Sequence, residues 1–285
     1  NQKNFGFAGG YNEGLNSVEA DYFMILNSDV EVPSNWLLPL VQMMEKDTQI
    51  GVVQPKIIWE VRKTHFEYAG AAGGFIDKWG YPFCRGRVFE ILENDNQQYD
   101  SDLEVFWATG ACMLIKADLF RKAQGFDTDF FAHMEEIDLC WRLKNMGYKI
   151  MCCARSVVYH YGGGTLPSDS PNKTYLNFRN SLIALIKNYH STKVLPIIVI
   201  RFFMDFAAFL KFVSDGDLKH AFAINRAHFA FLKSLPKSIE KRRQLKKLSS
   251  KTPSTSGVYG KSIVIEHFYR KTNVFSDLDQ QLFSK

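Results

Sequence analysis

The chain has 285 residues, 46% of them hydrophobic and 23% charged, which is the composition of a soluble globular protein with a sizeable core and excludes a disordered chain. Its five cysteines, at positions 84, 112, 140, 152 and 153, form no C-x-x-C pair and no metal-type spacing, so we expect buried thiols in a reducing compartment. The net charge of +5 is distributed unevenly along the chain, because residues 1–186 carry a net charge of −6 and residues 187–251 a net charge of +10. This split predicts a negatively charged partner for the second segment, such as a membrane surface or nucleic acid.

The first informative stretch is the glycine-rich FGFAGGYNEG at residues 5–14. Glycine adopts backbone angles that other residues avoid, so the stretch predicts a tight turn into a helix, with Asn12 as a candidate cap. A phosphate-binding loop is the alternative. The glycines at positions 6, 9, 10 and 14 match neither G-x-G-x-x-G nor a P-loop, and no lysine stands where one would grip a phosphate.

Residues 21–59 predict a strand, a helix and a second strand. The apolar run DYFMILNSD, residues 21–29, has the length of a buried strand that delivers polar side chains at its carboxyl end. A helix over residues 35–47 follows, with Ser34 as its cap, and residues 50–59 form a strand broken at Pro55. This order of elements indicates a right-handed crossover in a mostly parallel sheet.

The pattern becomes irregular over residues 60–102, and long excursions from α/β sheets often carry the functional site. Residues 104–120 return to a strand and the start of a helix. Residues 135–148 predict a helix closed by Gly147, and residues 149–165 a further strand that ends at His160 and three glycines. We therefore expect an α/β protein.

The segment after residue 187 differs in kind. Residues 193–213 are strongly apolar, but Arg201, Asp205 and Lys211 interrupt them, and a membrane-spanning helix needs about 20 uninterrupted apolar residues. The three polar residues can share one face of a helix opposite a phenylalanine-rich face, and a basic run follows at residues 240–247. Such a pairing is typical of a helix in a membrane interface, while a helix packed on the domain with a solvated basic tail is the alternative.

Polar side chains follow two of the predicted strands. Asn27 and Asp29 stand two apart after the first, so both can turn toward one point, where oxygen ligands suit Mg²⁺ or Mn²⁺ bridging phosphates. His160 ends the last strand. Each feature has a structural alternative, because N-x-D after a strand is commonly a turn and a single histidine is more often structural than a ligand.

Two further features complete the set of candidates. WATGACMLI, residues 107–115, is a loop of small residues where a backbone can approach a substrate. The stretch FFAHMEEIDLCWR puts Glu135, Glu136 and Asp138 in the first turn of a helix, with Arg142 one turn beyond Asp138. Acidic residues at a helix start can also serve only to complement the helix dipole.

In their order and spacing these features resemble the family-2 glycosyltransferases of the GT-A fold, in particular the rhamnosyltransferase-like branch that builds bacterial surface polysaccharides. The resemblance rests on NFGFAGGYNEG, YFMILNSDVEVP, TGACMLIKADLF, GFDTDFFAHMEEIDLCWRLKNMGYKI and VVYHYGGGT, in the family's order over residues 1 to about 185. It implies a Rossmann-like, mostly parallel sheet flanked by helices, with a helical carboxyl-terminal extension. We expect a GT-A domain over residues 1–186, a basic, aromatic-rich extension over 187–251 and a tail over 252–285.

The resemblance also implies roles for individual residues. Asp29 matches the metal-binding acid of the family's D-x-D, in which Asn27 replaces the first acid, and His160 takes the place of a further metal ligand. Glu136 matches the general base, with Glu135 as a possible substitute. Donor or acceptor binding is implied for Asn27, Gly9, Gly10, Asn12, Thr109, Gly110 and Arg142, and a catalytic position for Asp138, which should pair with Arg142 at helix spacing.

The implied function is metal-dependent, inverting transfer of rhamnose or a similar hexose from a nucleotide-diphosphate donor to a glycan or lipid-linked acceptor. Mg²⁺ or Mn²⁺ is the expected cofactor, and the protein is expected to be cytoplasmic and peripheral on an anionic membrane surface, the inner face of the plasma membrane. The alternative is a truncated, non-catalytic remnant, because two βα units precede the glycine-rich stretch in relatives, roughly sixty residues at ~30 residues a unit. No nucleic-acid partner is expected, since the basic run is interleaved with aliphatic residues and lacks a recognisable nucleic-acid module.

Overall fold

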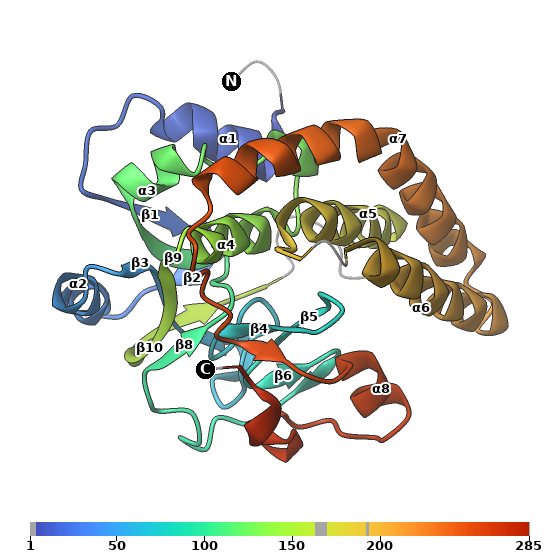
Figure 1. The fold of residues 1–285 in the computed structure, drawn as a ribbon. Helices are drawn as coiled ribbons and strands as arrows, with labels where there is room; N and C mark the ends of the chain where they lie inside the picture. The colour runs from blue at the N-terminus through green and yellow to red at the C-terminus, as the bar shows by residue number, and fades with distance from the viewer. Residues whose placement is uncertain (1–3, 163–169, 192–193, 285) are drawn as a thin grey trace. The chain divides into compact units, whose positions relative to one another are not determined.

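The computed structural model describes residues 4–162, 170–191 and 194–284 (Figure 1). The chain forms two compact units, each built from segments that are distant in the sequence. Unit 1 contains residues 1–17, 126–142 and 165–249, and unit 2 contains residues 18–125, 143–164 and 250–285. These units do not follow the predicted division of the chain at residues 186 and 251.

Unit 2 contains a six-stranded sheet. Its strands are β1 (Tyr22–Leu26), β2 (Val30–Glu31), β3 (Ile50–Trp59), β8 (Leu103–Val105), β9 (Cys112–Lys116) and β10 (Lys149–His160). Their order is β1-β9-β3-β10-β2, and β8 also pairs with β10. The β3–β10 pair is parallel, while β1–β9, β9–β3, β10–β2 and β10–β8 are antiparallel.

The α/β fold class is confirmed, but the sheet is mixed rather than mostly parallel. β1, β3 and β10 run in one direction, and α2 (Leu37–Lys46) connects β1 to β3 as predicted. β9 lies between β1 and β3 and runs antiparallel to both. A strand from much later in the chain thus enters between two strands that are consecutive in the sequence, and the local order of elements does not reveal such an insertion.

β3 continues through Pro55, where the sequence predicts a break. Pro55 pairs with Cys153 of β10, and the register shifts between Cys153 and Val157. Proline has no backbone N–H to donate to a ladder, so it is tolerated within a sheet mainly at edges and bulges. The irregularity in β10 beside Pro55 therefore explains how one strand spans the whole segment.

One face of the six-stranded sheet is covered by α2. Leu40, Met43 and Met44 lie on the same side of the helix and form a buried cluster with Val53 and Leu114. The helix begins at Leu37 and its cap position is Trp36, so the prediction of Ser34 as the cap was wrong. The buried side of the helix, rather than a capping side chain, accounts for its position.

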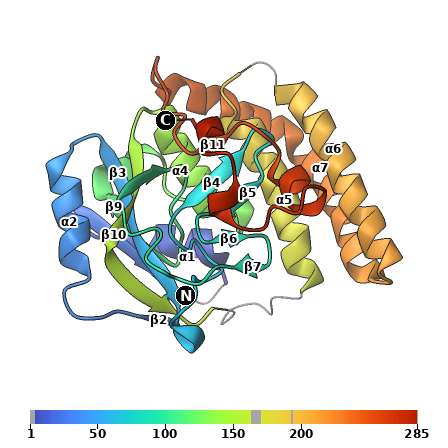
Figure 2. The same ribbon diagram turned by 90° about the horizontal axis from the view of Figure 1, so that it is seen from below.

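The irregular excursion forms a second, five-stranded sheet (Figure 2). Its order is β11-β4-β5-β6-β7, with bounds β4 (Gly74–Asp77), β5 (Pro82–Cys84), β6 (Arg87–Val88), β7 (Ile91–Leu92) and β11 (Val258–Tyr259). β11 comes from the carboxyl-terminal segment and pairs in parallel with β4. The rings of Phe75, Phe83, Tyr259, Phe275 and Phe283 form one aromatic cluster. Residues 252–285, predicted as a tail, therefore supply part of the core of unit 2.

Unit 1 is helical. It contains α1 (Gly6–Leu15), α5 (Pro171–Asn188), α6 (Val194–Ser214), α7 (Leu218–Leu248) and most of α4 (Glu135–Asn145), so the predicted helical extension is confirmed (Figure 1). Gly147 follows α4 with a φ of 92°, as expected for a residue that closes a helix. The short helices are α3 (Ala117–Lys122) and α8 (Ile263–Phe268), and 3-10 turns lie at Glu60–Arg62, Thr128–Phe130, Phe275–Asp277 and Gln280–Leu282.

Arg201 and Asp205 share one face of α6, as predicted, and this face is turned inward. Both side chains are buried, and Oδ2 of Asp205 lies 3.1 Å from Nε2 of His228 on α7. Lys211 does not belong to this face, because its side chain is exposed and pairs with Asp215 at 2.7 Å. α6 therefore packs within unit 1 through its charged side.

The prediction of buried thiols is confirmed, since all five cysteines are free and buried. Within the ranges that the structure describes, no helix has the length and apolar character needed to cross a bilayer. The last part of the glycine loop after His160, residues 163–165, lies outside the described residues.

Candidate active site

Two segments that carry predicted site residues meet where β10 ends. β2 pairs with the end of β10, so that Val30 lies opposite His160. The Tyr161 N–H donates to the carbonyl of Asp29 at 3.1 Å, which fixes the turn before β2 against the strand end. As a result Nε2 of His160 lies 3.2 Å from Oδ1 of Asp29, although 131 positions separate the two residues.

A second carboxylate, that of Glu67, flanks His160. Nδ1 of His160 lies 3.2 Å from Oε2 of Glu67, within ion-pair distance but without the geometry of a regular hydrogen bond. Burial by itself would lower the pKa of His160, but the Glu67 and Asp29 carboxylates outweigh it, so the pKa lies above its usual value. The sequence analysis missed Glu67, which stands in the irregular excursion with no motif around it.

Asp29 and His160 offer a carboxylate oxygen and an imidazole nitrogen, donor types that Mn²⁺ accepts. Among the residues described, no group of three or more His, Cys, Asp and Glu side chains is arranged to hold a metal ion. A cation bound by one or two protein ligands takes its other ligands from substrate phosphates and water. The donor pair therefore does not fit a closed structural site, and it would suit only an open site at which other groups complete the coordination.

The loop of small residues around Thr109 is fixed by hydrogen bonds to other residues of unit 2. The Thr109 N–H donates to Oε1 of the buried Gln54 at 2.9 Å, and Oγ1 of Thr109 accepts from the Ala111 N–H at 3.1 Å. The Ala111 carbonyl in turn accepts from the Asn27 N–H at 2.9 Å. Thr109 and the buried Gly110 therefore lie in a loop whose end is tied to Asn27, and Gln54, which the sequence analysis did not single out, fixes that loop.

The glycine-rich stretch of unit 1 forms α1, and Gly6 enters it with a φ of 68°, which confirms the predicted tight turn. Asn12 lies inside the helix and is not a cap. Its Nδ2 donates to the Phe126 carbonyl at 2.7 Å and its Oδ1 accepts from the Phe126 N–H at 2.9 Å. A Cβ at Gly9 would come within 2.8 Å of another side chain, whereas a Cβ at Gly10 would meet no described atom within 4 Å.

The start of α4 holds two acidic side chains in an unusual setting. Three residues just before it have positive φ angles, Phe131 (65°), His133 (68°) and Met134 (73°), a conformation that non-glycine residues seldom adopt away from functional sites. The Oε2 atoms of Glu135 and Glu136 are buried, and neither has a hydrogen-bond partner in the part of the chain that the structure describes. Buried polar atoms without a partner are uncommon, and a catalytic role is one of the explanations for them.

Burial raises the pKa of both glutamates, but to different extents. The pKa of Glu136 rises to about 7, because burial outweighs the nearby backbone N–H groups. The pKa of Glu135 rises well above its usual value through burial and through the charge of Glu136. Both carboxyl groups therefore keep a proton to higher pH than an exposed glutamate does.

Asp138 lies one turn beyond Glu135 in a closed network of charges. It is 0% exposed, and its carboxylate accepts from Arg142 Nε (2.9 Å), Lys187 Nζ (2.8 Å) and Asn188 Nδ2 (2.7 Å). The predicted Asp138–Arg142 ion pair is confirmed. Lys187 and Asn188 come from α5, and no spacing in the sequence links them to α4. The network anchors Asp138 through one contact within α4 and two contacts from α5.

Residues 1–123 match the model of a family described as glycosyl transferase family 2. The chain is 23% identical over 187 residues to the low-salt glycan biosynthesis hexosyltransferase Agl10 of Haloferax volcanii, over 64% of this chain and 57% of that protein. It is 27% identical over 104 residues to an N-acetylglucosaminyl-diphospho-decaprenol L-rhamnosyltransferase of Mycobacterium tuberculosis, over 36% of this chain and 34% of that protein.

Among solved structures, GalNAc-T7 with UDP, GalNAc and Mn²⁺ matches with a TM-score of 0.49 and 17% identity, over 66% of this chain and 35% of that one. The matched region of this chain spans 57% of the length of the Haloferax volcanii protein and 34% of the length of the Mycobacterium tuberculosis protein.

Proposed function

We propose that this protein transfers a sugar from a nucleotide-diphosphate donor to an acceptor hydroxyl with inversion at the anomeric carbon, because residues 1–123 match the glycosyl transferase family 2 model. The sugar is rhamnose or a similar hexose, and the acceptor is a glycan or a lipid-linked sugar. The names of the two relatives support this choice, since one describes a hexosyltransferase of glycan biosynthesis and the other a rhamnosyltransferase with a diphospho-decaprenol-linked sugar. We place the reaction at the inner face of a bacterial plasma membrane.

The observation that carries the proposal is the pair of buried Oε2 atoms, of Glu135 and Glu136, that have no hydrogen-bond partner among the described residues at the start of α4. Glu136 removes the proton of the acceptor hydroxyl as the oxygen attacks the anomeric carbon, and the bond from that carbon to the diphosphate oxygen breaks with its electron pair. A base with a pKa near the working pH typically contributes about 10² to 10⁴ in rate. With one base and a leaving group on the opposite face of the sugar, the product has the inverted configuration.

Neighbouring residues determine the environment of the Glu136 carboxylate. The pKa of Glu135 also lies well above its usual value, through burial and through the charge of Glu136. The ion pairs of Asp138 with Arg142 and Lys187 hold the first turn of α4 in place. Of the three acids in this turn, we assign proton acceptance to Glu136, with Glu135 as the alternative.

In unit 2, Asp29 and His160 would hold Mg²⁺ or Mn²⁺, and Asn27 stands two positions from Asp29. When bound, such a cation supplies Lewis-acid neutralisation of the departing diphosphate. The Thr109–Gly110 loop, whose end is tied to the backbone of Asn27, is suited to contact the donor.

The test is a transfer assay with the full chain, Mn²⁺ or Mg²⁺, a panel of nucleotide-diphosphate rhamnose and hexoses, and a lipid-diphosphate-linked N-acetylglucosamine acceptor. Release of nucleoside diphosphate should require the metal and should be lost in Glu136→Gln. Glu13→Gln, which changes an exposed glutamate of α1, is the matched control and should retain activity. If no donor is turned over and calorimetry detects no metal-dependent binding of a nucleoside diphosphate, the proposal is overturned in favour of a non-catalytic protein.

A further inference from the structure

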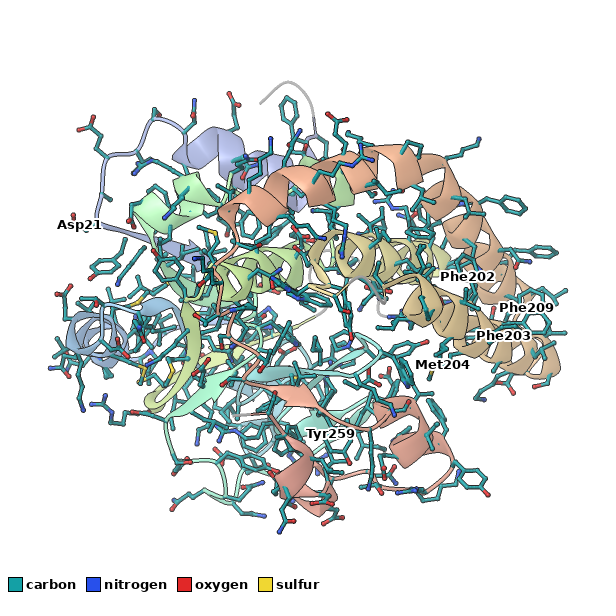
Figure 3. All side chains as sticks on the ribbon, in the orientation of Figure 1. Asp21, Phe202, Phe203, Met204, Phe209 and Tyr259 are labelled. Carbon is teal, nitrogen blue, oxygen red and sulfur yellow. The ribbon has the colours of Figure 1, made fainter. Side chains whose placement is uncertain are left out.

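α6 exposes a continuous row of large apolar side chains. The row consists of Leu195, Val199, Phe203, Phe206, Leu210 and Val213. Steps of three and four residues place them on one side of the helix. Phe203 is 72% exposed, whereas the neighbouring Phe202 packs inward against His228 and Phe231 of α7, and both phenylalanines are labelled in Figure 3. A surface helix normally presents the opposite arrangement, with its apolar side inward.

α7 carries a second exposed row, formed by Leu218, Phe222, Phe229 and Leu232. α6 and α7 lie side by side in unit 1 (Figures 1 and 2). We call the two rows together the α6–α7 apolar face. Monomeric soluble proteins seldom expose large apolar surfaces unless they bind a partner there.

Buried polar contacts fix the direction in which this face points. Nη2 of Arg201 donates to Oγ of Ser181 on α5 at 2.7 Å, and Thr174 of α5 contacts His220 of α7 at 2.7 Å. α5 therefore covers the inner side of both helices. Turning the apolar row of α6 inward would expose these contacts and bury phenylalanine rings against them, so the outward orientation is built into the fold.

A row of cations runs beside the apolar row of α7. Lys219, Arg226 and Lys233 are all exposed and are spaced seven residues apart, which is close to two helical turns. The whole segment 187–251 carries a net charge of +10. Apolar side chains flanked by cations match the interface of a bilayer with anionic headgroups, where rings enter the acyl boundary and cations meet phosphates.

We propose that the α6–α7 apolar face docks on an anionic lipid bilayer. A second copy of the chain fits less well, because a pair of such faces would bring two sets of the same cations together. The docking is independent of the transfer chemistry, and it deepens the proposed function only in giving access to a lipid-linked acceptor. Membrane docking and proton transfer would then use different helices, since the α6–α7 apolar face lies on α6 and α7 and the candidate base lies on α4.

The test is co-sedimentation of the full chain with vesicles of phosphatidylcholine alone or mixed with phosphatidylglycerol, without any sugar donor. We expect binding to the anionic vesicles that weakens with salt. Phe203→Gln/Phe229→Gln should weaken it at least ~10-fold, because two exposed rings are lost from the face. The matched control is Val61→Gln/Tyr269→Gln, which changes side chains that are 65% and 84% exposed outside the face and should leave binding unchanged. A Lys219→Gln/Arg226→Gln/Lys233→Gln variant should lose the preference for anionic vesicles.

Several outcomes would overturn the proposal: no binding to either vesicle, equal binding to both, or equal loss in the control. A wild-type dimer in sedimentation equilibrium that becomes monomeric in Phe203→Gln/Phe229→Gln, without vesicle binding, would instead make the face an interface between copies. The melting temperature of each variant reports folding, and we expect no change because the altered rings are 72% and 70% exposed. Transfer to a water-soluble acceptor should stay unchanged in the double variant, so failure of docking and failure of the proposed reaction are distinguished.

Discussion

Glu136→Gln should stabilise the folded protein at alkaline pH while it removes the proposed base. Burial raises the pKa of Glu136 from 4.5 to about 7. Each pH unit of difference is worth ~1.4 kcal/mol, so ionising Glu136 in the folded protein costs about 3 kcal/mol. Because the folded protein holds this proton more tightly than the unfolded chain does, stability is full below the unfolded pKa and is lost as the pH rises through the folded pKa. Glutamine has no charge and avoids this loss.

The assay is urea unfolding of wild type and Glu136→Gln at about pH 5 and about pH 8. The free energy of unfolding of the variant relative to wild type should be higher at the alkaline pH by roughly 2–3 kcal/mol. Release of Glu135 from the charge of Glu136 acts in the same direction. Glu13→Gln, which changes an exposed side chain of α1 in the same way, is the matched control. An equal difference at both pH values, or a difference of opposite sign, would refute the account that burial raises the pKa of the Glu136 carboxyl group.

Three other substitutions test the ionic network and the proposed metal ligands. Lys187→Met removes the cation that Asp127 (2.5 Å) and Asp138 (2.8 Å) share, so the free energy of unfolding in a urea titration should fall by about 3–5 kcal/mol. A loss under ~1 kcal/mol would show that the network is not needed for stability. Asp29→Ala should abolish Mn²⁺-dependent binding of a nucleoside diphosphate in calorimetry at an unchanged melting temperature, and wild-type affinity would exclude Asp29 as a ligand. His160→Ala should weaken the Mn²⁺ dependence of transfer less severely, since water can replace one ligand, and an unchanged Mn²⁺ titration would leave His160 a structural residue.

Local patterns predicted the elements that depend on neighbouring residues. The strand at Tyr22–Leu26, the helix closed by Gly147 and the strand ending at His160 lie where apolar runs and turn residues place them. The Asp138–Arg142 pair follows from helix spacing alone. These features were predictable because the interactions that form them lie within a few residues.

Features that depend on distant partners were not predictable in this way. The bulge in β10 that accommodates Pro55, and the insertion of β9 between β1 and β3, arise from pairing with strands far along the chain. Within unit 2, Glu67 contacts His160, and within unit 1, Lys187 contacts Asp138, and no sequence spacing encodes either tertiary contact. The aromatic cluster that ties residues 252–285 into unit 2 is of the same kind.

The choice of base is tested most directly by comparing the transfer rates of Glu136→Gln and Glu135→Gln with a saturating donor. Adjacent helical residues point about 100° apart, so one of the two faces the acceptor. We predict that Glu136→Gln lowers the rate at least ~10²-fold with donor binding nearly unchanged, and that Glu135→Gln does much less. The wild-type rate should rise with pH through the pKa of Glu136, about 7. The reverse order of the two variants, or two equal small losses, would contradict Glu136 as the base.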